Sequence, residues 1–279
     1  MQTKLIASVF FFIFLYSCKE EKKTTENSEK QSDSLITNRD IPVTKTDTAI
    51  EKKEKVSPPE ESICGQMILF KKGTVIENHI LNAAGTESSK QKSRVVEVHR
   101  QGSSMIAKIE METDSKEPDA QPITANYVCN GQNLLMDMTS LFSNFEKKGV
   151  TIKGQAISFP LQVKVGEVLP DASYSFTISQ FAMPIIITTI IKNRKVEAKE
   201  TVKTPAGSFE CYKIISDVDA EPRVEGGDEK MQVLMKSMKA KMPKQSFIMW
   251  YSPKTGVVKV EMYSNARLTM TSEVTAIKK

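Results

Sequence analysis

The chain after residue 62 alternates between short runs of hydrophobic or β-branched residues and polar turns. Two pairs of runs flank the dipeptides Gln101-Gly102 and Asn130-Gly131, which are typical of β-hairpin turns. Further runs of this kind occupy residues 66–80, 173–179, 185–191, 207–216, 247–251, 256–263 and 268–277. About a dozen short strands without long helices between them predict a mainly β fold. We expect an antiparallel curved sheet, or an open β-barrel-like domain, with one or two short helices.

Two stretches have helical rather than β spacing. The weaker one covers residues 139–147, and the stronger one covers 228–242. In the stronger stretch Asp228 is an N-cap candidate and Pro243 ends the helix.

The predicted helix 228–242 has one apolar stripe, and its lysines lie mostly outside that stripe. The stripe consists of Met231, Leu234, Met235, Met238 and Met242. Such a basic, methionine-rich helix can lie on a membrane or close over an apolar ligand, since methionine adapts to irregular shapes. The alternative is that the stripe packs on one face of the sheet, and we favour packing because it is the commoner arrangement.

The N-terminus has the organisation of an export signal. A basic start, Met1–Lys4, precedes the apolar stretch Leu5–Tyr16, which is too short to span a bilayer. The sequence Leu15-Tyr16-Ser17-Cys18 resembles the lipobox of bacterial lipoproteins. This resemblance implies that residues 1–17 are removed and that Cys18 is acylated on its sulfur and its new amine. The alternative is an ordinary secretory signal with an incidental cysteine.

Residues 18–62 follow as the lipidated cysteine and a flexible tether. The tether is rich in Glu, Lys, Thr, Ser and Asp and has too few large apolar residues to fold. Its start, Lys19-Glu20-Glu21, resembles a signal that routes some lipoproteins to the cell surface. We expect an outer-membrane lipoprotein, facing either the periplasm or the cell surface. Residues 63–279 are left for a single β-rich globular domain.

The composition argues against a nucleic-acid partner and against a metal site. With 39 Lys+Arg against 34 Asp+Glu, the net charge of +5 gives no case for a nucleic-acid partner. There are only 2 His among 279 residues. His79 and His99 lack the spacing of a metal site, so we expect no metal, no cofactor and no catalytic residues.

Removal of Cys18 for the lipid leaves three cysteines and three alternative disulfide pairs. We favour Cys64–Cys129, which would join the first residues of the domain to the strand before Asn130-Gly131. Cys211 alternates with Tyr212 in a predicted strand and is expected to be a buried thiol.

Four ordered blocks resemble a known family. They are residues 160–172 (PLQVKVGEVLPDA), 193–201 (NRKVEAKET), 204–214 (TPAGSFECYKI) and 250–259 (WYSPKTGVVK). Together they look like the TapB-like bacterial envelope lipoproteins, relatives of a broader domain-of-unknown-function group. The resemblance spans about Cys64–Ile277 and implies a mostly antiparallel β fold without an established activity. The methionine-rich segment Glu225–Lys244 departs from it, where a shorter link is expected.

Two functions are consistent with these observations. The first is a non-enzymatic, membrane-anchored binding module for an apolar ligand or an envelope partner protein. The alternative is a structural or assembly component of the cell envelope that acts through protein–protein contacts.

Overall fold

A computed structural model describes residues 62–114, 122–142, 149–179 and 183–279. The compact unit that contains them is Pro58–Lys279. The predicted signal peptide, the lipidated Cys18 and the tether up to residue 61 lie outside the described residues.

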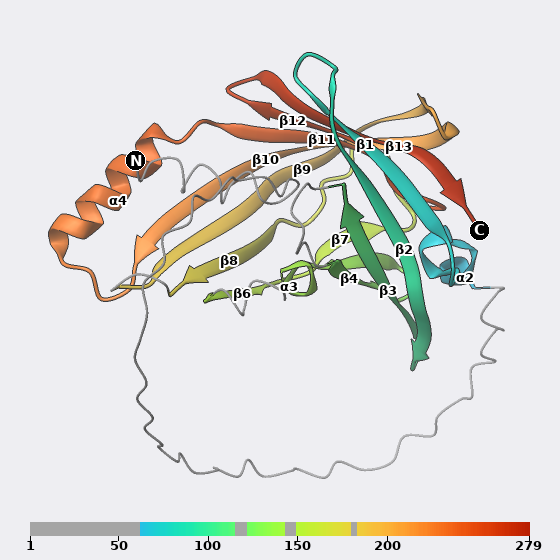
Figure 1. Ribbon diagram of the computed structural model, residues 1–279, viewed down its shortest axis with the longest axis horizontal. Helices are drawn as coiled ribbons and strands as arrows, with labels where there is room; N and C mark the ends of the chain where they lie inside the picture. Colours follow the sequence, from blue (N-terminus) through green and yellow to red (C-terminus); the bar gives the residue numbers. More distant parts are fainter. Residues whose placement is uncertain (1–61, 115–121, 143–148, 180–182) are drawn as a thin grey trace, which may run out of the picture. The chain divides into compact units, whose positions relative to one another are not determined.

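Thirteen strands form one antiparallel sheet, in the order β6-β8-β9-β10-β11-β12-β13-β1-β2-β3-β4-β5-β7 (Figure 1). The strands are β1 (Val75–Asn82), β2 (Glu87–Gln101), β3 (Ser104–Thr113), β4 (Ile123–Cys129), β5 (Asn133–Asp137), β6 (Val150–Gly154), β7 (Ile157–Pro160), β8 (Ala172–Ile178), β9 (Ile185–Thr204), β10 (Gly207–Val224), β11 (Gln245–Ser252), β12 (Gly256–Ser264) and β13 (Arg267–Lys278). The sheet is strongly curved and open, with β6 and β7 as its two edges. The predicted mainly β, antiparallel curved sheet is confirmed.

Within the described ranges, three α-helices and one 3-10 turn accompany the sheet. They are α2 (Ile63–Gln66), η1 (Ile68–Phe70), α3 (Met138–Leu141) and α4 (Glu229–Lys241). The Asp228 carboxylate accepts a hydrogen bond from Met231 N (2.9 Å), so Asp228 caps α4 as the sequence predicts. The predicted helix 139–147 is a single turn, α3, and residues 143–148 lie outside the described part.

The longest strands exceed the sequence expectation. Strand β9 has 20 residues, although the apolar run that predicts it ends at Ile191. Beyond that point its buried positions, Arg194 and Val196, alternate with exposed charged residues. The second half of β9, in which buried and charged residues alternate, therefore continues the strand. It pairs with β10 as a long hairpin that turns at Pro205-Ala206.

Distant strands meet in the interior of the curved sheet. The rings of Phe159 on β7 and Tyr251 on β11 stack with centroids 5.2 Å apart, although the two strands are far apart in the sheet order. Both side chains are almost fully buried. This contact requires the sheet to curl, so the core fills its concave side.

One buried arginine links the two ends of the sheet. Arg194 on β9 is 0% exposed, and its two terminal nitrogens donate to the carbonyls of Ser158 (2.9 Å) and Pro170 (2.7 Å). Its guanidinium carbon lies 5.4 Å from the centroid of the Phe159 ring. Ser158 belongs to the edge strand β7, whereas Pro170 directly precedes β8 near the other edge. The backbone also joins the two edges here, because only Gln155 and Ala156 separate β6 from β7 and Gln155 N donates to Ser173 O (3.0 Å).

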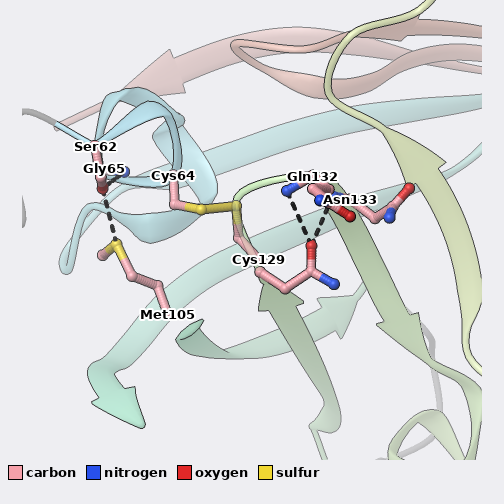
Figure 2. Close-up of a disulfide and its surroundings, with 8 residues drawn as sticks. Ser62, Cys64, Gly65, Met105, Cys129, Gln132 and Asn133 are labelled. Atoms are coloured by element: carbon pink, nitrogen blue, oxygen red, sulfur yellow. Dashed lines mark hydrogen bonds between the residues drawn. A yellow bond between two sulfur atoms is a disulfide. The ribbon is translucent and has the colours of Figure 1, made fainter. Parts of the chain in front are cut away.

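A disulfide ties the start of the domain to the sheet (Figure 2). It joins Cys64 in α2 to Cys129 at the end of β4, across 65 positions of sequence. This is the pair that the sequence favours, and the remaining described cysteine, Cys211, is buried with a free thiol. Next to Cys129, the Asn130 side chain accepts from the amides of Gln132 and Asn133 and shapes the β4–β5 turn.

Replacing Arg194 with methionine should lower the free energy of unfolding by about 3 kcal/mol, because the buried guanidinium's bonds to Ser158 O and Pro170 O are lost. Urea unfolding followed by Trp250 fluorescence measures this change. Lys195→Met, at the adjacent exposed position, is the control and should change stability by less than about 0.5 kcal/mol. A methionine variant as stable as the unchanged protein would show that the arginine does not hold the sheet ends together.

Loss of the disulfide should cost about 4 kcal/mol on the chain-entropy model, because the bond closes a long loop. The double variant Cys64→Ser, Cys129→Ser tests this by urea unfolding with and without a reductant. The reductant should destabilise the unchanged protein by a similar amount and leave the double variant unaffected. Equal sensitivity of both proteins to the reductant would contradict the assignment.

Candidate functional site

Cys211 and the two histidines of the described residues lie on three different strands, β10, β1 and β2. Cys211 is 0% exposed, and burial, followed by the nearby Glu210 and Glu200 carboxylates, raises the pKa of its thiol to about 12. It is therefore a protonated core residue at neutral pH. His79 and His99 lie on β1 and β2, where each contacts a glutamate at the surface, Glu87 (2.8 Å) and Glu97 (3.3 Å).

Metal-binding clusters and membrane-spanning helices are both lacking among the described residues. Within the described ranges, no group of three or more His, Cys, Asp or Glu side chains is placed to hold a metal ion. None of the helices in the same ranges is long and apolar enough to cross a membrane.

The structure separates the residues of the predicted methionine stripe. Met235 is buried (6% exposed), and Met231, Met238 and Met242 are partly buried where α4 lies beside β10. Leu234 is instead 49% exposed, so its assignment to the packed stripe is wrong. Leu234 precedes Met235 by one position, which on a helix of 3.6 residues per turn rotates it about 100° away from the buried direction.

The segment between β7 and β8, residues 161–171, is part of one family-like block, but the sequence does not mark it as a contact surface; we call it the valine loop. The loop precedes β8 in the chain and runs along β9 past the N-terminal end of β8. Backbone hydrogen bonds fix it there. Gly166 N donates to Val196 O (2.8 Å), Val196 N donates to Glu167 O (2.9 Å), and Leu169 N donates to Arg194 O (2.8 Å). The loop also has its own turn, in which Glu167 N donates to Lys164 O and the Glu167 carboxylate accepts from Lys164 N.

Arg194 fixes the C-terminal end of the valine loop through a side-chain hydrogen bond. Its bond to Pro170 O supplements the backbone bonds of β9, and Ser158 O, its other partner, lies just before the loop begins. Burial lowers the pKa of the guanidinium to about 10, against the opposing effect of the Asp171 charge. The group therefore stays protonated at neutral pH and can keep both carbonyls bound.

The valine loop buries some of its apolar side chains and exposes others. Leu161, Val163 and Leu169 are buried, whereas Val165 is 57% exposed and Val168 is 73% exposed. Val168 forms an antiparallel bridge with Lys195, and the flanking bonds are those of a non-hydrogen-bonded pair. The amide and carbonyl of Val168 therefore point away from β9, toward the outside of the sheet.

This arrangement is suited to binding. Two apolar side chains and an outward-facing peptide group are presented on a loop whose backbone is fixed at both ends. A rigid apolar protrusion of this kind is suited to a protein partner, because little conformational entropy is lost when it is bound. Sequence reasoning missed it because apolar residues occur at both odd and even positions of 161–169, which does not tell the exposed ones from the buried ones.

Two solved structures share the fold. A Bacteroides fragilis protein, described as exported and of YmcC-like fold, superposes with a TM-score of 0.54 at 20% identity, covering 75% of this chain and 97% of that protein. A Parabacteroides distasonis protein, described as a lipoprotein, gives a TM-score of 0.54 at 19% identity, covering 75% of this chain and 96% of that protein. No curated protein is significantly similar to the chain.

A family model also covers most of the domain. The model of the DUF3108-like family matches residues 71–274, a range that includes Arg194, the valine loop and α4. The resemblance to a domain-of-unknown-function group is confirmed, whereas the TapB-like name finds no support in these comparisons. This chain therefore belongs to the DUF3108-like family.

Proposed function

We propose that this protein is an outer-membrane lipoprotein, anchored through Cys18, whose domain is a non-enzymatic binding module for an envelope partner protein. The lipobox-like sequence before Cys18 supports the anchor. The structural neighbours described as exported and as a lipoprotein support a location in the envelope. The anchored domain faces either the periplasm or the cell surface.

The observation that carries this proposal is the exposure of Val165 and Val168 on a loop with a fixed backbone. Exposed valines on a mobile loop would be unremarkable surface residues. Here three backbone bonds to β9 and the Arg194 bond to Pro170 hold them in place. Apolar side chains that are held in place at the surface can bury area in a protein interface without a large entropic cost.

An apolar ligand beneath α4 is the other form of the binding hypothesis. It would need methionines that can close over the ligand. In the structure Met235 is already buried where α4 lies beside β10, and Lys239 Nζ bonds the Glu221 carboxylate of β10 at 2.7 Å. These contacts favour the packing interpretation of the stripe, so we propose the partner protein as the occupant.

The second candidate function is a structural or assembly role in the envelope. Deletion of the tether distinguishes this role from partner binding. If the protein spans a distance in the envelope, deletion of residues 19–57 should abolish function while the domain remains folded. If it only binds a partner, the shortened protein should keep the same crosslinked partner as the full chain.

A photoreactive amino acid at position 168 of the full lipidated chain should crosslink to one discrete envelope protein in cells. The same probe at position 257 is the control, because Val257 is also an exposed valine (37%) but lies on β12. The proposal predicts an adduct at 168 that is missing at 257. Identical adducts at both positions, or none at 168, would contradict it.

The variant Val165→Ser, Val168→Ser should weaken that partner at least about 10-fold, because two apolar contacts are lost. Its stability should change by less than about 0.5 kcal/mol per site, since both side chains are exposed. Val257→Ser is the matched control for both measurements. Unchanged affinity of the double variant would remove the valine loop from the interface.

A further inference from the structure

The two sides of α4 have different chemistry. Its inner side carries Met235, which is buried, and the side chains that bond β10. Gln232 Nε2 donates to Val224 O (3.4 Å), and Lys239 Nζ lies 2.7 Å from a Glu221 oxygen and 4.0 Å from an Asp219 oxygen. The Glu221 hydrogen bond, ahead of the opposing effect of burial, raises the pKa of Lys239, so this lysine is committed to the protein itself.

The outer side of α4 combines two exposed apolar side chains with lysines. Val233 is 60% exposed and Leu234 is 49% exposed. At about 100° per residue, Val233 lies almost opposite Met235, with Leu234 toward one border of the outer side. Exposed lysines at positions 230, 236 and 241 surround Val233 on this outer side.

The charge on this side is largely uncompensated. Within the described part of the chain, none of Lys230, Lys236, Lys241 and Lys244 forms an ion pair. Asp228 and Glu229 lie at the N-terminal end of the helix, and the Asp228 carboxylate is used in its cap. The rest of the outer side is therefore a positive surface with an apolar centre.

We propose that the outer side of α4 binds the surface of an anionic phospholipid membrane. Lysines contribute about 1 kcal/mol each when they lie near an anionic membrane surface, and exposed apolar side chains can enter the interface between headgroups and acyl chains. Because only Val233 and Leu234 are available for insertion, the attraction is mainly electrostatic. The lysines match the negative phosphates of the lipids, whereas an apolar groove of a protein would offer them no opposite charge.

The lipid anchor would make this contact efficient. Residues 18–62 can extend to at most about 150 Å, so an anchored domain can place α4 on the membrane that holds it. In Figure 1 α4 and α2, where the tether enters, lie at opposite ends of the described domain. Contact through α4 would therefore orient the domain relative to the membrane, which the tether alone cannot do. This inference uses a different surface from the valine loop and does not depend on the partner protein.

Binding to vesicles tests the proposal without the lipid anchor. The full mature chain with Cys18→Ser should cosediment with vesicles of equal parts phosphatidylcholine and phosphatidylglycerol, and much less with phosphatidylcholine alone. The variant Lys230→Gln, Lys236→Gln, Lys241→Gln should bind about 100-fold more weakly, as three lysine contacts are lost. Raising the salt from about 0.1 M to about 1 M should also release the unchanged chain, because screening shortens from ~10 Å to ~3 Å.

The matched control is Lys71→Gln, Lys72→Gln, Lys203→Gln. It has the same net charge as the α4 variant but changes exposed lysines elsewhere, and it should bind within about 3-fold of the unchanged chain. A second variant, Val233→Ser, Leu234→Ser, should weaken binding about 10-fold without altering the charge. Equal binding by both lysine variants, or failure of the unchanged chain to bind anionic vesicles, would overturn the proposal. The proposal would also be overturned if the chain did not bind vesicles and a probe at position 233 crosslinked to a protein in cells.

Discussion

The buried Arg194 is the interaction on which the arrangement of this domain depends. The sheet of thirteen strands has β6 and β7 as its edges, and the link Gln155-Ala156 between them keeps the edges close together, so the concave face has to be filled by buried side chains. Arg194 donates to Ser158 O of one edge strand and to Pro170 O before β8 near the other edge, and its guanidinium lies near the Phe159 ring. Burial of the charge is unfavourable, and Arg194 Nε has no hydrogen-bond partner among the described residues. The two carbonyls and the ring offset this cost only when the sheet is curled, so the arginine favours the closed arrangement over a flatter one.

Beside the turn of the β9–β10 hairpin, Cys211, Trp250 and Val258 form a small buried apolar cluster, and polar contacts border it. The Trp250 indole donates to a Glu200 carboxylate oxygen, and Lys259 Nζ lies 4.7 Å from the centroid of the Trp250 ring. Lys259 also pairs with Glu261 at 2.7 Å, and the Tyr263 hydroxyl donates to Glu261. That hydrogen bond, together with burial, raises the pKa of Tyr263 to about 12. These contacts link β9, β11 and β12 next to the apolar cluster, so charged and apolar side chains together stabilise the far end of the long hairpin.

Against this background, the two proposed contact surfaces have a common physical basis. The valine loop and α4 both present apolar side chains outward from a segment that is firmly attached on its other side. The attachment differs: backbone bonds and Arg194 hold the loop, whereas methionine packing and Lys239 hold the helix. Their chemistry differs as well, since the valine loop is apolar with an outward peptide group and α4 is basic. This difference is why we assign a protein partner to the first and an anionic membrane surface to the second.

The sequence by itself determined the class of fold, the hairpin turns and the position of the main helix. These features depend on local chemistry: the period-two alternation of strands, glycine at turns such as Asn130-Gly131, and the Asp228 cap before a helical stripe. The favoured Cys64–Cys129 pair also came from sequence, through the position of each cysteine next to a predicted element. Only the tertiary structure decided that β9 continues for 20 residues, that Leu234 faces outward, and that Val165 and Val168 are exposed while Leu161 and Val163 are buried. Each of these depends on which other segment contacts a side chain: α4 packs on β10 through Met235, and β9 with Arg194 fixes the valine loop.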